Sequence, residues 1–349
     1  MAKQLGMQYA ILTTKHHDGF AMFPTKTSDF SIASTPYEKD IVGEFVDAMR
    51  AEGLRVGIYF SLIDWYHPDY PAFTEADKPY RFDRIPQPQT EQWERFLEVM
   101  FNQIRELLTN YGKIDVIWFD GHWERSPEQW QAKKLETMIR ELQPDILIND
   151  RLPGAGDFET TEQFIPAQAP ENTWETCLTI NNSWGYNASD TDFKSSRTLI
   201  HTLCEVAGKG GNLLLNVSPM SNGEIPPEQV ERLQGVARWI AKHGESILGT
   251  EAGLEPWQFY GPSTRKENRV YLHLLMKPYE TISVRGMPIK RIKSVSVLGN
   301  GETLTYRGRC PIIDELLNPD PLGELTISVP TAVIDEDATV IVIEIEESK

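Results

Sequence analysis

One strongly apolar segment, residues 113–123 (KIDVIWFDGHW), constrains the fold more than any other part of the chain. Ile114 and residues 116–119 are apolar on both faces of an extended backbone, which is typical of a strand buried between a barrel interior and covering helices. Asp120 ends this run. A carboxylate is costly to bury unless it is paired or used, and α/β barrels keep catalytic groups at the carboxyl ends of their strands. We interpret Asp120 either as such a group or as a cap for the turn at Gly121.

The alternation of strand and helix continues through most of the chain. The sequence predicts strands at 7–14, 54–60, 114–120, 145–149, 157–162, 177–181 and 212–217, and helices at 40–52, 91–109, 127–142, 192–208 and 226–247. Such alternation gives a parallel sheet with crossovers. No Gly-x-Gly-x-x-Gly motif follows the first strand, and polar residues follow nearly every strand, so we favour a (β/α)8-like TIM barrel over a doubly wound sheet. About seven strands are found, and we expect the missing first strand to precede residue 1.

The pattern changes after Gly253. Short strands are predicted at 256–260, 269–276, 281–284, 291–298, 302–306, 324–329 and 338–345, separated by turn residues and without an intervening helix. This indicates an antiparallel β-sandwich. We therefore predict two domains, a catalytic barrel at 1–252 and a C-terminal β-sandwich at 253–349.

Charge and composition exclude several classes of partner. The net charge of −17 argues against nucleic acid and anionic membranes, which both require a basic surface. Three widely spaced cysteines indicate neither a disulfide framework nor a zinc cluster. No segment has the roughly 20 consecutive apolar residues of a membrane span. The first residues lack the apolar core of a signal peptide, so the chain as written is expected in the cytoplasm, and a secreted or periplasmic location follows if its amino terminus is incomplete.

Polar side chains with chemical potential gather at the predicted carboxyl ends of strands: His16, His17, Tyr59, Asp120 and Arg151. Each has a simple structural interpretation when taken alone. The histidines could satisfy a loop, the tyrosine could belong to the core, and the arginine could form a salt bridge. A metal site made of His16, His17 and Asp18 is another interpretation. In a barrel, however, the strand ends surround one pocket, and this convergence favours a common site.

Six motifs carry a resemblance to a known family: KHHDGF at 15–20, GIYFS at 57–61, IWFDG at 117–121, NDR at 149–151, DFETTE at 157–162 and GGNLLLNVSP at 210–219. Together they resemble the α-L-fucosidases of glycoside hydrolase family 29. The resemblance implies a retaining, exo-acting α-L-fucosidase that hydrolyses terminal α-L-fucosyl residues of fucosylated oligosaccharides or glycoconjugates by double displacement, with no cofactor and no metal.

The resemblance also implies roles for individual residues. Asp120 would be the nucleophile and Glu162 the acid/base. The remaining residues would line the fucose subsite: His16, His17, Tyr59, Trp118 and Arg151. Retaining enzymes need two carboxyl groups about 5–5.5 Å apart. Three other acidic residues, Glu159, Glu171 and Glu175, lie in the same irregular segment as Glu162, and Glu175 is the second choice for the acid/base.

Two further hypotheses stay open. Members of the family usually have an earlier first strand, so the chain could be a fucose-binding protein with a crippled site. An open barrel would also expose a strand edge and invite formation of a homo-oligomer. The other hypothesis is a metal-dependent hydrolase that uses His16, His17 and Asp18.

Overall fold

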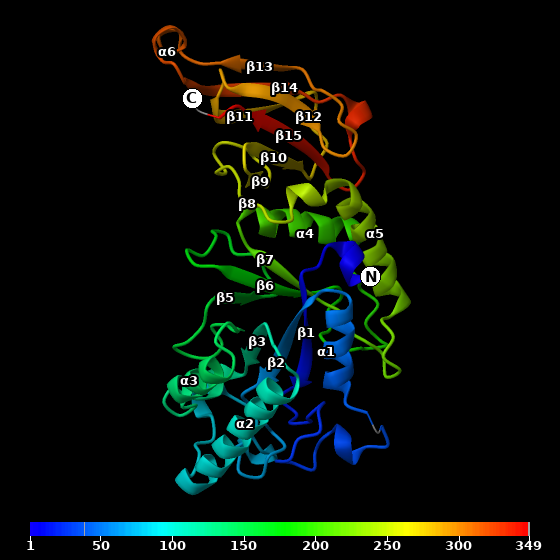
Figure 1. Cartoon of the computed structure of the whole chain (residues 1–349), viewed down its shortest axis with the longest axis vertical. Helices are drawn as coiled ribbons and strands as arrows, with labels where there is room; N and C mark the ends of the chain where they lie inside the picture. The colour runs from blue at the N-terminus through cyan, green and yellow to red at the C-terminus, as the bar shows by residue number, and fades with distance from the viewer. Residues whose placement is uncertain (38, 348–349) are drawn as a thin grey trace. The chain divides into compact units, whose positions relative to one another are not determined.

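The computed structural model describes residues 1–37 and 39–347. The chain forms two compact units (Figure 1). One unit is Met7–Thr160, and the other combines Met1–Gly6 with the chain from Thr161 onward. The predicted division into domains 1–252 and 253–349 is a different partition, and it stays a prediction.

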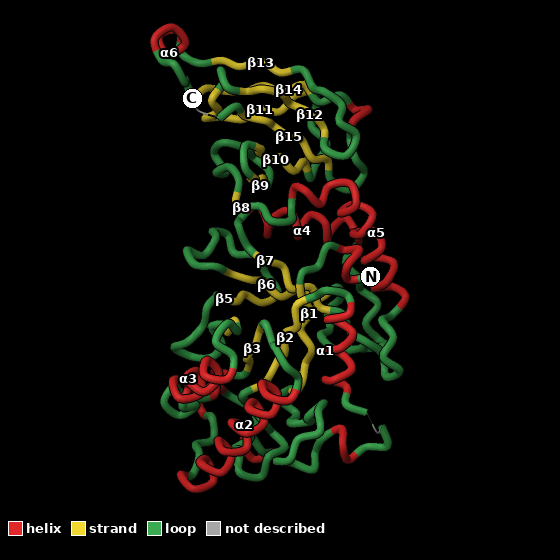
Figure 2. Tube along the Cα trace, in the orientation of Figure 1, coloured by secondary structure: helices red, strands yellow, loops and turns green. Residues whose placement is uncertain are grey.

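The unit Met7–Thr160 is built on a parallel sheet with strand order β1-β2-β3-β4 (Figure 2). The strands are β1 (Tyr9–Lys15), β2 (Arg55–Ser61), β3 (Val116–Asp120) and β4 (Leu147–Ile148), and the helices between them are α1 (Ile41–Ala51), α2 (Thr90–Asn110) and α3 (Ala132–Leu142). Tyr59 pairs with Trp118 across β2 and β3, and Ser61 pairs with Asp120. This register brings the carboxyl ends of the two strands to the same level.

Local sequence explains why these elements form. The Asp40 side chain caps α1 by accepting a hydrogen bond from the Gly43 backbone N–H. Helix α2 buries one apolar face, which includes Phe96, Met100 and Ile104. These side chains join the fully buried residues of β2 and β3 in one hydrophobic core. That core fixes the strands whose ends carry the candidate site.

The second unit begins with a sheet of order β5-β6-β7 and continues into an antiparallel sandwich. Its barrel-type elements are β5 (Glu159–Glu162), which begins in the first unit, β6 (Trp174–Thr179), α4 (Ser196–Gly208), β7 (Asn212–Asn216) and α5 (Pro227–His243). Strands β6 and β7 are parallel. The sandwich contains β8 (Glu251–Ala252), β9 (Ser263–Lys266), β10 (Arg269–Leu274), β11 (Thr281–Pro288), β12 (Ile292–Val297), β13 (Tyr306–Arg309), α6 (Ile312–Leu317), β14 (Leu322–Ser328) and β15 (Thr339–Ile345). Its two sheets, β12-β15-β10-β9-β8 and β11-β14-β13, share one apolar core.

Several predicted elements are wrong in detail. The strand predicted at 256–260 is a turn, which Gln258 closes through bonds to the Glu255 backbone. The strand predicted at 302–306 is replaced by β13, which begins at Tyr306. The expectation that no helix interrupts the sandwich is also wrong, because α6 begins directly after Pro311, a favourable residue at a helix start.

Two boundaries moved for local reasons. The helix predicted from residue 192 begins at Ser196, because the Ser195 side chain caps it by accepting from the Thr198 N–H. The strand predicted at 177–181 is β6, Trp174–Thr179. Among the described residues, no helix combines the length and apolarity that crossing a membrane requires.

Candidate active site

Asp120, the last residue of β3, is the centre of the site in the unit Met7–Thr160. Its carboxylate is buried, and two strong donors hold it. The Tyr59 hydroxyl donates to Oδ2 at 2.6 Å, and Nη1 of Arg151 donates to Oδ1 at 2.6 Å. Such short bonds to an ionised acceptor are among the strongest in proteins. Asp120 therefore does more than cap the turn at Gly121.

The electrostatic balance keeps Asp120 ionised. Burial alone would raise the pKa of this carboxyl, because it disfavours the charged form. The hydrogen bond from Tyr59 and the positive charge of Arg151 outweigh burial, and the pKa lies below its usual range. Asp120 is therefore a carboxylate at neutral pH, which is the form that a nucleophile needs.

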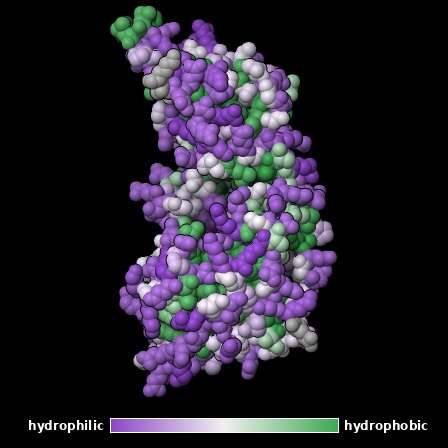
Figure 3. Space-filling view, viewed as in Figure 1, coloured by the Kyte–Doolittle hydropathy of each residue, from purple (hydrophilic) through white to green (hydrophobic). Residues whose placement is uncertain are grey.

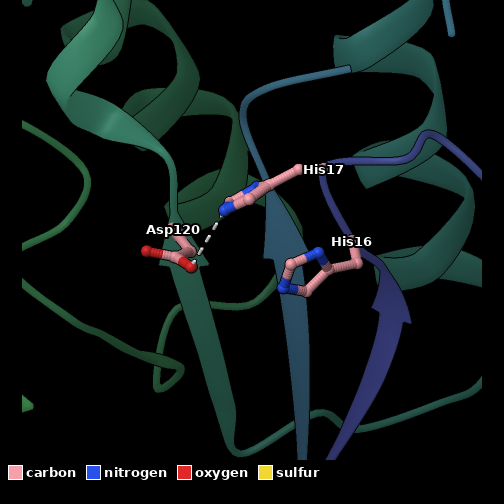
Figure 4. A group of neighbouring side chains, drawn as sticks. All are labelled: His16, His17 and Asp120. Atoms are coloured by element: carbon pink, nitrogen blue, oxygen red, sulfur yellow. Dashed lines mark ion pairs between the residues drawn. The ribbon is translucent and has the colours of Figure 1, made fainter. Parts of the chain in front are cut away.

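His16 and His17 follow the end of β1 and reach the same place. Gly19 has a φ of 82°, and its N–H donates to the His16 carbonyl, so the backbone turns directly after the strand. The two rings extend toward Asp120, with centroids 4.2 Å apart (Figure 4). Nε2 of His17 lies 3.6 Å from Oδ2 of Asp120. Adjacent residues of a regular strand point to opposite faces, so this turn is what allows both histidines to face Asp120.

The protonation of His17 follows from its neighbours. Nδ1 lies 2.6 Å from the Ser61 hydroxyl, which donates its single proton to the Ile63 carbonyl at 2.8 Å. Ser61 must then accept from His17, so Nδ1 carries the proton and Nε2 keeps a lone pair. Burial and the neighbouring His16 lower the pKa of His17 to about 4, although Asp120 opposes this shift. Near neutral pH, His17 thus offers a hydrogen-bond acceptor beside Asp120.

Aromatic rings form a wall next to the carboxylate. The Tyr59 ring stacks between His16 and Trp118, with centroid distances of 5.5 and 5.6 Å. The Arg151 guanidinium lies over the Trp118 ring at 4.6 Å while it binds Asp120. The site thus combines a flat apolar face with directional polar groups. This combination suits a sugar ring, which has apolar C–H faces and hydroxyl groups at its edges.

Two positioning residues were not identified from the sequence. Asn149 is fully buried, and its amide bonds both the N–H and the carbonyl of Phe119, at 2.7 and 3.0 Å. It thereby ties the β4 end, which leads to Arg151, to the residue before Asp120. Ser61 orients His17. The Asn-Asp-Arg run gave a partial signal for Asn149, whereas the role of Ser61 depends on a contact between distant segments.

Two tryptophans at the edge of the site were also not identified. Trp65 and Trp123 each contact the His17 ring edge-on, at 5.2 and 5.7 Å. They are 51% and 43% exposed, so part of each ring is available at the surface. A buried pair positions the loop of Trp65, because Asp64 binds Lys15 at 3.2 Å and accepts from two backbone N–H groups of that loop.

His16, His17 and Asp120 could also hold a cation, because their ligating atoms all lie within 4.8 Å of one another. Asp18, which the sequence suggested as a ligand, is not in this group. The guanidinium of Arg151 binds Asp120 at 2.6 Å, and a divalent cation would have to compete with this charge. The donor set therefore fits a nucleophile better than a metal ligand.

The two candidate acid/base residues lie in the other unit and differ in position. Glu162 is exposed at the carboxyl end of β5. Glu175 is buried near the start of β6, where Oε2 accepts from the Asn212 amide at 2.7 Å. Parallel strands of a barrel present catalytic groups at their carboxyl ends. Position along the strand therefore favours Glu162.

Comparison with known proteins identifies the family. Residues 1–245 match the family model described as alpha-L-fucosidase. The chain belongs to the α-L-fucosidase family. The tissue alpha-L-fucosidase of Bos taurus is 30% identical over 324 residues, which cover 87% of this chain. The alpha-L-fucosidase of Dictyostelium discoideum is 28% identical over 313 residues, which cover 84% of it. This fucosidase-family chain spans 65% and 64% of the length of these two curated relatives.

Solved structures of fucosidases share the fold. The alpha-L-fucosidase isoenzyme 1 from Paenibacillus thiaminolyticus is 38% identical and superposes with a TM-score of 0.86, covering 99% of this chain and 85% of its own. A second solved structure is that of a family 29 α-L-fucosidase from Bacteroides thetaiotaomicron, trapped as a covalent intermediate with 2-fluoro-fucosyl fluoride. It is 29% identical and superposes with a TM-score of 0.85, covering 99% of this chain and 80% of its own. The predicted fold class, a (β/α)8-like barrel with a C-terminal β-sandwich, is confirmed.

Proposed function

We propose that this chain is a retaining, exo-acting α-L-fucosidase, which removes terminal α-L-fucosyl residues from oligosaccharides and glycoconjugates by double displacement. The observation that carries the proposal is the ionised Asp120 carboxylate, held between Tyr59 and Arg151 at the end of β3. Membership of the α-L-fucosidase family supports the substrate. The covalent intermediate trapped in the Bacteroides relative supports double displacement.

In the first step, an Asp120 oxygen attacks the anomeric carbon while Glu162 gives its proton to the leaving oxygen. The glycosidic bond breaks and a fucosyl ester of Asp120 forms. In the second step, Glu162 takes a proton from water, whose oxygen attacks the same carbon and releases Asp120 as a carboxylate. Two inversions give net retention. Tyr59 and Arg151 hold the attacking group in its charged form and in one orientation.

Substrate binding uses the remaining groups of the site. The free lone pair on Nε2 of His17 accepts a hydrogen bond from a sugar hydroxyl, and His16 lies beside it. Arg151 supplies donors near the reacting carbon. Trp118 is buried, with the Tyr59 ring stacked on it and the Arg151 guanidinium over it, so it lines the subsite from behind and holds these two groups in place. The position of Glu162 at the end of β5 supports it over Glu175 as the acid/base.

The test uses 4-nitrophenyl α-L-fucoside. We expect Asp120→Asn to lower kcat/KM by roughly a thousandfold, as loss of a group central to the chemistry does in other enzymes. Asp115, directly before the other end of β3, provides a matched control, since its Oδ2 accepts from the Val56 N–H and Asp115→Asn keeps an acceptor. Azide should restore turnover in Asp120→Gly, giving fucosyl azide of inverted configuration. Unchanged turnover in Asp120→Asn would exclude the nucleophile role.

Two alternatives are tested with the same preparations. The cluster of His16, His17 and Asp120 favours a metal-dependent hydrolase as the second candidate. That function requires activity to fall on dialysis against EDTA and to return with metal, whereas the fucosidase proposal requires no change. A protein that only binds fucose would give a calorimetric signal with L-fucose and no release of 4-nitrophenol.

A further inference from the structure

The short helix α6 has an unusual surface. Four large aliphatic side chains, Ile312, Ile313, Leu316 and Leu317, are 73%, 66%, 73% and 78% exposed. Leu322, at the start of β14, is 60% exposed. Hydrophobic colour collects in Figure 3 at the position that Figure 1 labels α6. Single exposed leucines are ordinary, but a contiguous group of this kind marks an interaction site.

The four helical side chains form one stripe. Residues at i, i+1, i+4 and i+5 lie on a single face of a helix, and these positions are 312, 313, 316 and 317. Asp314 and Glu315 occupy the opposite face. The stripe is therefore an ordered apolar surface that lies outside the hydrophobic core of the sandwich.

Polar contacts to the backbone hold α6 in place. The Lys290 ammonium donates to the carbonyls of Glu315 and Asn318, at 2.7 and 3.0 Å. Arg291 binds Asp320 just after the helix, at 2.9 Å. These bonds position the carboxyl end of α6 without using its apolar side chains. The stripe is thus presented outward on an anchored support.

Charge beside the stripe is balanced, unlike the rest of the chain. Arg307 and Arg309 are exposed on the edge strand β13, and Asp314 and Glu315 are exposed on α6. Within the part of the chain that the structure describes, residues 1–37 and 39–347, none of these four side chains forms an ion pair. A chain with a net charge of −17 repels its own copies over most of its surface, but this patch carries equal numbers of both signs.

We propose that the α6 patch, defined as Arg307, Arg309, α6 and Leu322, is a self-association surface that binds the same patch of a second copy. In a two-fold contact each residue meets its counterpart in both directions. The arginines of one copy can then face the carboxylates of the other while the stripes pack together. A patch with both signs and an apolar centre is complementary to itself, which favours this chain as its own partner.

The apolar area sets the expected strength. At about 25 cal/mol per Å², the roughly 1.5–3 kcal/mol gained by burying one leucine or isoleucine corresponds to about 60–120 Å². The five side chains, at their observed exposures, then provide about 200–400 Å² per copy. A standard interface buries about 800 Å² per partner, roughly 60% of it apolar. The patch supplies about 40–80% of that apolar area, so we expect a weak dimer with a Kd of about 1–100 μM.

The experiment is sedimentation velocity of the full chain over a concentration series from about 1 to 200 μM. We expect reversible dimerisation in the wild type and at least tenfold weaker dimerisation in Ile312→Lys/Leu316→Lys. The matched control is Met276→Lys/Tyr279→Lys, which places the same two charges on other exposed large side chains, 68% and 90% exposed. All four positions are exposed, so folding is retained, and circular dichroism verifies it. A monomeric wild type, or equal dimerisation in all three proteins, would overturn the proposal.

A charge exchange tests whether the partner is the same patch. Arg307→Glu/Arg309→Glu makes the patch wholly acidic, and Asp314→Lys/Glu315→Lys makes it wholly basic. Each variant should be monomeric alone, and an equimolar mixture should form a heterodimer that dissociates at high salt. If both variants stayed monomeric in the mixture, the result would contradict a contact between two copies of the same patch. Binding of the wild type, but not of Ile312→Lys/Leu316→Lys, to neutral phosphatidylcholine vesicles without self-association would assign the patch to lipid and overturn the proposal.

Discussion

Replacing Tyr59 by phenylalanine removes the hydrogen bond from its phenol to the proposed nucleophile. The lost bond joins the phenol to Oδ2 of Asp120 at 2.6 Å, while the ring that stacks on His16 and Trp118 remains. Hydrogen bonds to charged groups contribute about 1.5–3 kcal/mol, and one pKa unit corresponds to about 1.4 kcal/mol. Because the bond stabilises the ionised form, its loss should raise the pKa of Asp120 by about 1–2 units.

The assay is the pH dependence of kcat/KM with 4-nitrophenyl α-L-fucoside, which reports the pKa values of the free enzyme. The acid limb requires ionised Asp120, so in Tyr59→Phe it should move to higher pH by about 1–2 units. Tyr70→Phe is the matched control, because that buried phenol donates to Glu124 instead. An acid limb that stays in place in Tyr59→Phe, or moves equally in Tyr70→Phe, would refute the reasoning.

Three further predictions concern stability and roles. Burial lowers the pKa of His273 to about 3, so as the pH falls below about 6.5 this imidazole is protonated in the unfolded chain but not in the folded one, and the free energy of unfolding decreases. Urea unfolding at pH 7 and pH 5 measures this decrease, and His273→Gln should make it smaller by about 2 kcal/mol. Asn149→Ala leaves the buried N–H and carbonyl of Phe119 unpaired and should cost about 2–4 kcal/mol by the same method, and an unchanged midpoint would contradict this. Glu162→Gln should slow hydrolysis of fucosyl oligosaccharides by about a hundredfold and of the 4-nitrophenyl substrate much less, because only the oligosaccharide needs a proton on its leaving group. If Glu175→Gln showed this pattern and Glu162→Gln did not, the acid/base role would belong to Glu175.

Periodicity predicted the parts of the fold that burial determines. The apolar run at 116–119 could only be a buried strand, and the strand and helix alternation followed the same logic. The sequence did not indicate α6, because a spacing of apolar residues predicts a helix through the face that it buries. Ile312, Ile313, Leu316 and Leu317 are instead exposed. At 256–260 the side chain of Gln258 decides for a turn, and no periodic signal reports such a bond.

The candidate site divides in the same way. Strand ends gave His16, His17, Tyr59, Asp120 and Arg151, because topology brings those positions together. Their roles, and those of Trp118 and Glu162, stay predictions until they are measured. The contacts that tune them depend on segments far apart in sequence. The Ser61 hydroxyl, for instance, fixes the tautomer of His17 across 44 residues.

One register difference bears on the choice of acid/base. The strand predicted at 177–181 left Glu175 in the loop before it, in the same irregular region as Glu162. Strand β6 in fact begins at Trp174, so Glu175 is buried near the amino end of a strand and bound to Asn212. The strand begins three residues earlier than predicted, which places Glu175 inside its amino end instead of in the preceding loop, and sequence patterns do not resolve boundaries that finely. The predicted homo-oligomer and cellular location likewise stay predictions.

The most direct test of the central claim is to trap the glycosyl-enzyme. The protein is incubated with 2-fluoro-fucosyl fluoride, digested with a protease, and analysed by mass spectrometry. The account predicts one fluorofucosyl group per chain, on the peptide that contains Asp120, and no labelling of Asp120→Asn. A label on any other residue, or rapid release of sugar with inverted configuration and no adduct, would contradict it.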